Sequence, residues 1–162
     1  MDFRVGEDVK MYFPVTDQVT GTAIDCTGAA AQWTCGTLAG NTFTPRLTKH
    51  TTDITNPITI VENPQTPNDH TTNTFLVLLD HSETGDFLGE YFHELAMELD
   101  DFRIVLYPPI LQTASANFTV YPSWSWDSDS DEPRIAFLEA PVDISQLPEP
   151  EPEPLKPGRK IA

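Results

Sequence analysis

The chain of 162 residues is long enough for one domain with an extension, and too short for two large lobes around a central cleft. Nine lysine and arginine residues oppose 25 aspartate and glutamate residues, so the formal net charge is −16. Because nucleic-acid backbones and anionic lipid surfaces are also negative, we expect no direct binding to nucleic acid and no binding to a membrane. The acidity fits either a plain role in solubility or docking onto a basic partner surface.

The N-terminus shows no signal-peptide pattern, and no apolar run approaches the roughly 20 residues that a membrane helix needs. We therefore expect a protein that is made in a cytoplasm and stays soluble. In that reducing compartment Cys26 and Cys35 are expected to be free thiols rather than a disulfide. Two cysteines and four scattered histidines do not form a four-ligand zinc site, so we predict no metal and no cofactor.

Strand signals dominate the first three-quarters of the chain, and turn formers such as Gly40-Asn41 separate them. Pro14 is expected to end the first strand, Glu62–Asn73 is predicted to be a surface loop, and His81–Gly85 a turn. The predicted strands are Val9–Phe13, Ala29–Leu38, Thr42–Thr48, Ile58–Val61, Phe75–Leu79, Tyr91–Leu99, Arg103–Tyr107 and Asn117–Tyr121.

Two of these strands carry more information than the others. Phe75–Leu79 is apolar on both faces, which predicts a central strand buried between two layers. Tyr91–Leu99 fits either a strand, with Tyr91, His93, Leu95, Met97 and Leu99 on one face, or a helix made of good helix formers. Gly89 before the segment and Asp100-Asp101 after it favour a hairpin, so we predict a strand. Seven to nine strands with turns between them are typical of an antiparallel β-sandwich over residues 1–122.

The composition changes after Pro122. The segment 123–162 holds an acidic stretch, a short apolar patch and a Pro-Glu repeat, and it ends in basic residues. Proline at every second position favours an extended polyproline conformation. We therefore predict an extended, acidic, proline-rich C-terminal arm.

No motif of organised catalysis stands out, and we predict that the chain is not an enzyme. His93-Glu94 begins like the zinc-protease motif, but Met97 takes the place of its second histidine. Asp127, Asp129 and Asp131 alternate as in a calcium-binding loop, yet the required glycine and bidentate glutamate are missing, so a solvated acidic linker is the favoured interpretation.

The predicted contact residues lie in the C-terminal arm. Trp124 and Trp126 serve either as interface anchors or as a cover over the open end of the sandwich. The apolar patch is expected to add a strand to the sheet edge of a neighbour, and the basic tip to contact an acidic surface of another subunit. The complete set of predicted partner-binding residues is Trp124, Trp126, Ile135, Phe137, Leu138, Lys156, Arg159 and Lys160.

One stretch of the domain resembles a known family. Glu83-Thr84-Gly85-Asp86-Phe87 is followed by Gly89-Glu90-Tyr91-Phe92-His93-Glu94-Leu95, and Asn117–Val120 comes later as a closing strand. The order of these segments over residues 5–122 resembles the N-terminal Ig-like domains of phage baseplate upper proteins and related virion Ig-like modules. The chain departs from the family in having Asp100-Asp101 where an Asp-Gly turn is usual, and a short arm where a fibre or coil is usual.

The resemblance implies an Ig-like β-sandwich that acts as a structural protein of a bacteriophage particle, with no catalytic residues to carry over. Its expected partners are other virion proteins, contacted in many copies or as a homo-oligomer. Capsid decoration, a neck position, and attachment of a tail, baseplate or fibre all fit this hypothesis. The alternative is a carbohydrate- or receptor-binding β-sandwich module, with loop 62–73 and the two arm tryptophans as its candidate site.

Overall fold

The computed structural model describes residues 1–99, 102–108, 117–122 and 133–143. In this part of the chain the protein is almost entirely β, with eleven strands and one short helix, α1 (His81–Thr84). The predicted all-β class is therefore confirmed. All eight predicted strand regions form strands, although their ends shift by a few residues.

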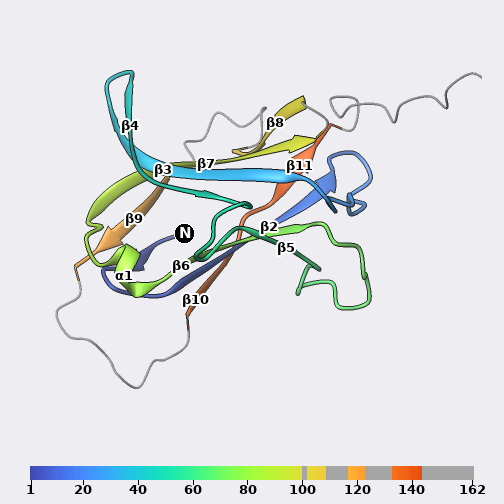
Figure 1. The fold of residues 1–162 in the computed structure, drawn as a ribbon, viewed down its shortest axis with the longest axis horizontal. Coiled ribbons are helices and arrows are strands. Elements are labelled where there is room, and N and C mark those ends of the chain that lie inside the picture. Colours follow the sequence, from blue (N-terminus) through green and yellow to red (C-terminus); the bar gives the residue numbers. More distant parts are fainter. Residues whose placement is uncertain (100–101, 109–116, 123–132, 144–162) are drawn as a thin grey trace, which may run out of the picture.

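Sheet A has six strands in the order β1-β9-β7-β3-β4, with β8 beside β9 on the same edge of β7. Its strands are β1 (Phe3–Arg4), β3 (Ala30–Ala39), β4 (Thr42–His50), β7 (Gly89–Leu99), β8 (Phe102–Tyr107) and β9 (Asn117–Tyr121). Figure 1 shows that the hairpin of β3 and β4 projects from the rest of the sheet. All residues from Thr37 to Arg46 are exposed on this projection.

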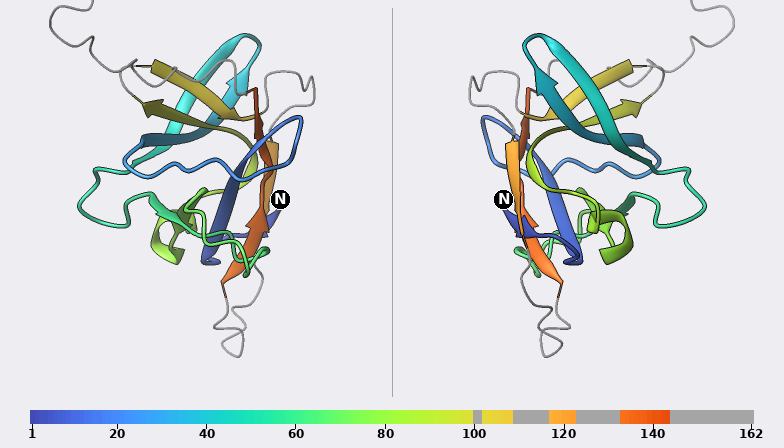
Figure 2. Two further views of the ribbon diagram at one scale, coloured as in Figure 1. Left: turned by 90° about the vertical axis from the view of Figure 1, so that its right-hand side faces the viewer. Right: turned by 90° about the vertical axis from the view of Figure 1, so that its left-hand side faces the viewer.

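Sheet B has five strands in the order β10-β2-β6-β5, with β11 following β10 along β2. Its strands are β2 (Val9–Asp17), β5 (Thr59–Val61), β6 (Thr74–Leu79), β10 (Arg134–Phe137) and β11 (Ala140–Val142). The two sheets pack against each other: the ring of Phe13 in β2 meets Tyr107 of β8 edge-on, with centroids 5.5 Å apart. Figure 2 shows the two layers from both sides.

The centre of the core contains a polar pair among aromatic rings. Trp33 of β3 is fully buried, and its indole Nε1 donates a hydrogen bond to Nδ1 of His93 in β7 at 3.1 Å. Only 4% of the surface of His93 is exposed, because Phe13, Tyr107 and Phe118 surround its ring. The accepted hydrogen bond requires the neutral form of the imidazole, with its proton on Nε2.

Strand β7 confirms the choice of strand over helix for Tyr91–Leu99. One edge of β7 pairs with β3, and the other pairs with β9 and then β8. Tyr91, His93, Leu95 and Met97 are buried on one side of the strand, as the alternation predicted. Helix propensity differs by only a few tenths of a kcal/mol per residue, whereas burial of large apolar side chains contributes about 1.5–3 kcal/mol each, so tertiary packing decides.

Pro14 does not end the first strand, contrary to the prediction. The N–H of Val15 donates to the carbonyl of Asn73 on the β6 side, so the nitrogen of Pro14 faces the opposite edge. On that edge β10 and β11 pair with β2 in one continuous register, and the gap between them lies beside Pro14. The missing N–H of proline thus interrupts the neighbouring strand while β2 itself continues to Asp17.

The predicted turn at His81–Gly85 is a single helical turn. Asp80 caps it: the carboxylate accepts hydrogen bonds from the backbone N–H groups of Ser82 and Glu83. The carboxylate of Glu83 in turn accepts the N–H of Asp80 at 2.9 Å, which completes a capping box. This reciprocal pattern was present in the sequence as Asp-x-x-Glu and was missed.

The C-terminal strands correct two predictions. The sandwich was predicted to be antiparallel, but β10 and β11 pair with β2 in parallel, and β1 pairs with β9 in parallel. Residues 135–138 were expected to join the sheet of a neighbour, but β10 joins the sheet of its own chain. Part of the segment assigned to the arm therefore completes sheet B, because a strand that returns after a long connection can align parallel to its new neighbour.

Both cysteines are free thiols, as predicted, and both are buried. Burial raises the pKa of Cys26 and that of Cys35 to about 12. At pH 8 the reactive thiolate is therefore about a thousandfold scarcer than for a free cysteine. We expect an aromatic disulfide reagent to label both thiols at least ~100-fold more slowly in the native protein than in urea. Labelling of either thiol at the unfolded rate under native conditions would contradict this burial.

Candidate docking surface

The side of sheet B that faces away from the core is largely apolar. Val9, Met11 and Phe13 of β2 point into the core, so the residues between them point outward. The strand registers place side chains of β6 and β10 next to these residues on the same side. We call this surface the outer face; it consists of Lys10, Tyr12, Leu76, Leu78, Ile135 and Phe137.

The residues from β10 are the most exposed apolar groups of the outer face. Ile135 is 55% exposed and Phe137 is 37% exposed. The ring of Phe137 stacks on that of Tyr12, with centroids 5.1 Å apart and an angle of 16° between the planes. This stack covers part of each ring and holds the side chain of Phe137 flat on the sheet, so the surface is ordered before any partner arrives.

Strand β6 supplies the side of the outer face opposite β10, with β2 between them. It lies between β2 and β5, so its predicted central position is confirmed. It is not buried between two layers, however: Phe75, Val77 and Leu79 are buried in the core, while Leu76 and Leu78 stay half-buried. The sequence shows that both sides of this strand are apolar, and both were predicted to be buried. In the structure the outer of these two sides is part of the contact surface.

The start of β10 is held by an ion pair. The guanidinium of Arg134 lies against the carboxylate of Glu7, with Nε donating to Oε2 at 2.8 Å. The hydrogen bond from Arg134 lowers the pKa of Glu7 below its usual value, and Glu7 raises the pKa of Arg134. The backbone N–H of Arg134 also donates to the carbonyl of Asp8 at 2.8 Å. Together these bonds hold the start of β10 beside β2, immediately before Ile135.

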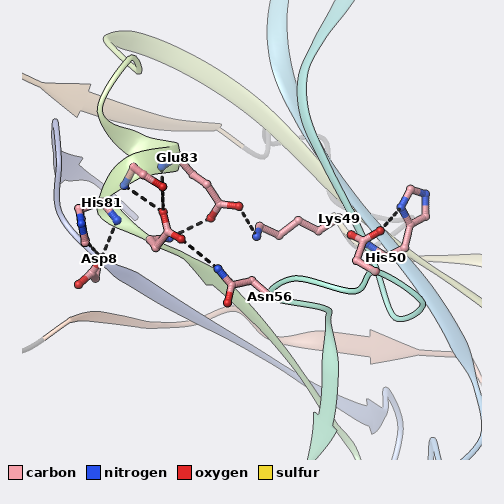
Figure 3. Close-up of polar contacts among 9 residues, drawn as sticks. Asp8, Lys49, His50, Asn56, His81 and Glu83 are labelled. Atoms are coloured by element: carbon pink, nitrogen blue, oxygen red, sulfur yellow. Dashed lines mark hydrogen bonds and ion pairs between the residues drawn. The ribbon is translucent and has the colours of Figure 1, made fainter.

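One end of the outer face opens into a hollow of about 270 Å³, lined by both polar and apolar residues. Lys10 and Leu78 belong both to the outer face and to the wall of this hollow. Asp8 accepts the backbone N–H of His81 at 2.6 Å, and Asn56 Nδ2 donates to Asp80 at 3.0 Å, as Figure 3 shows. The hydrogen bond from the Ser82 hydroxyl lowers the pKa of Asp80, so its carboxylate stays charged at the rim of the apolar surface.

The structure brings together only part of the predicted contact set. Ile135 and Phe137 lie on the outer face, whereas Leu138 turns inward and packs against the core. Trp124, Trp126, Lys156, Arg159 and Lys160 lie outside the described residues, as does the acidic stretch with Asp127, Asp129 and Asp131. Sequence reasoning missed the three apolar members Tyr12, Leu76 and Leu78.

Among the described residues, no group of three or more His, Cys, Asp or Glu residues is placed to hold a metal ion. No helix in this part of the chain has the length and apolar character needed to cross a membrane. A comparison of the sequence with models of known protein families finds no match, and a search of curated proteins finds none either.

Proposed function

We propose that the protein is a non-enzymatic, Ig-like β-sandwich module that docks onto another structural protein of a bacteriophage particle. The observation that carries this proposal is the outer face of sheet B, where the exposed side chains of Ile135 and Phe137 lie beside Lys10 and Tyr12 of β2. Apolar side chains gathered on one surface and rimmed by polar groups are typical of a protein interface. The virion context rests on the sequence resemblance around β7.

The energetics favour the outer face as a contact surface. Exposed Ile135 and Phe137 gain hydrophobic free energy when a partner removes them from water, at about 25 cal/mol per Å² of apolar area. Because backbone pairing and the Arg134–Glu7 ion pair already position β10, docking orders few further groups. Aromatic anchors such as Tyr12 and Phe137 are common at the centre of interfaces, where they carry much of the binding energy.

The test compares incorporation of variants into phage particles. We expect the double variant Ile135→Ser, Phe137→Ser to be incorporated about tenfold less than the wild type, or lower still, because it removes the two most exposed apolar side chains of the outer face. The single variant Ile135→Asp keeps the Tyr12–Phe137 stack and should act in the same direction. The measurement is quantitative immunoblotting of purified particles, with thermal unfolding of each variant as a check of the fold.

A matched control replaces exposed apolar residues elsewhere on the surface. Val19 is 85% exposed and Ile54 is fully exposed, and neither lies on the outer face. Val19→Ser, Ile54→Ser should be incorporated like the wild type. Equal incorporation of the outer-face and control variants would overturn docking through the outer face. Absence of the wild-type protein from purified particles, with the protein present in the lysate, would overturn the virion role.

A further inference from the structure

A second hollow, of about 410 Å³, lies on the far side of the molecule, against sheet A. It is lined by Thr34, Phe43, Phe92, His93, Glu94 and Pro108. It lies beside an interruption in strand pairing: β9 pairs with β7 as far as Phe92, and β8 pairs with β7 from Leu95 onward. His93 and Glu94 therefore have no partner strand on that edge among the described residues.

One wall of the hollow is an aromatic ring held in place by a glycine. Phe43 of the projecting hairpin is 41% exposed, and its ring lies against Gly36 of β3. A Cβ atom at Gly36 would stand 2.8 Å from the ring and would also collide with the backbone of Thr44 and Pro45. The glycine thus permits the close approach that brings Phe43 to the same hollow as Phe92.

Of the polar groups that line the hollow, only Glu94 is exposed, and its carboxylate offers a hydrogen-bond acceptor. The Thr34 hydroxyl already contacts Thr48 and Gln32, each at 3.3 Å. His93 accepts from Trp33 through Nδ1, and its Nε2–H has no hydrogen-bond partner but is buried away from solvent. Glu94 is exposed, and in the described part of the chain its carboxylate has no hydrogen-bond or ion-pair partner.

We propose that this hollow binds the guanidinium group of an arginine side chain from a partner protein. A carboxylate is the natural acceptor for the forked N–H donors of arginine, and phenylalanine rings attract a planar cation. The net charge of −16 favours a basic partner at long range. A sugar fits less well, because its hydroxyl groups need donors as well as acceptors, and the unpartnered N–H of His93 is buried away from solvent.

This site is independent of the proposed docking through the outer face, because the two surfaces lie on different sheets and share no residue. A module with two contact surfaces can join two neighbours in an assembly. The outer face would bury apolar area against one of them, and the hollow would select a basic side chain of the other. The variants that test one surface leave the other intact, so the two proposals can fail separately.

The experiment uses the full chain and a capped arginine, acetyl-arginine methylamide, as the probe. We expect saturable NMR shifts of the Phe43 and Phe92 ring signals, with half-saturation in the millimolar range. The corresponding citrulline compound has nearly the same shape and no charge, and it should cause no saturable shift. Glu94→Gln should raise the half-saturation concentration about two- to fivefold, because it removes the negative partner.

The matched control is Glu98→Gln, which makes the same change of charge on the same strand, outside the hollow. It should bind the probe like the wild type. Unchanged binding by Glu94→Gln, equal shifts with the citrulline compound, or no shift of either ring would each overturn the proposal. Two-dimensional NMR spectra of both variants verify that they are folded.

Discussion

Replacing Glu83 with glutamine is expected to lower the free energy of unfolding by about 2–3 kcal/mol. Lys49 of β4 is a buried cation, 3% exposed, and its Nζ lies 2.7 Å from Oε1 of Glu83 in α1, as Figure 3 shows. The pair ties sheet A to the helical turn that follows β6. Glutamine has nearly the same shape as glutamate, but it leaves the charge of Lys49 buried and without an ionic partner.

The size of this effect follows from the burial of the two groups. Removing one partner of a fully buried pair costs roughly 3–5 kcal/mol. The Glu83 side chain is 23% exposed, so water partly compensates and the expected loss is smaller. Glutamine can still serve at this position of a capping box, so the helical turn itself should survive. Urea unfolding, followed by circular dichroism, measures the difference.

Two further variants make the interpretation specific. Glu62→Gln breaks an exposed pair with His70 and should change the free energy of unfolding by less than about 0.5 kcal/mol. Combining Glu83→Gln with Lys49→Met removes the charge that was left unpaired and should recover most of the lost stability. If Glu83→Gln is as stable as the wild type, the buried ion pair does not contribute to the fold as argued.

The second large effect is a loss of stability in acid caused by His93. Burial lowers the pKa of His93 from 6.5 to about 3. Between these two values the unfolded chain binds a proton that the folded protein does not, so the free energy of unfolding falls as the pH falls. The contribution of His93 is complete above pH ~6.5, and its loss approaches about 1.4 kcal/mol per pH unit below that value.

The variant His93→Gln isolates this contribution. Glutamine can still accept the hydrogen bond from Trp33 and has no charge to gain, so its stability should depend less on pH. From pH 6.5 to pH 4 the wild type should lose roughly 3 kcal/mol more than the variant. Urea unfolding at a series of pH values measures both curves. His70→Gln, at an exposed position, is the control. Parallel curves for the wild type and His93→Gln would show that His93 does not control acid stability.

The sequence determined most of the local structure, because alternation and apolar runs report directly on which residues a strand can bury. Phe75–Leu79 and Tyr91–Leu99 were both predicted as strands, and both are. For β7 the alternation of buried side chains outweighed the helix propensity of individual residues. The free state of the Cys26 and Cys35 thiols was also predicted, whereas their burial was not.

Only the tertiary structure decided how distant segments meet. The effect of Pro14 depended on which edge of β2 its nitrogen faces, and the position of β10 depended on a strand returning from far along the chain. The candidate docking surface was likewise predicted only in part from the sequence. Ile135 and Phe137 were found as an apolar patch, but Tyr12 and Leu76 join them through strand register alone. A one-dimensional pattern shows that a strand has two apolar sides, whereas the neighbouring strands and layers determine which side stays exposed to solvent.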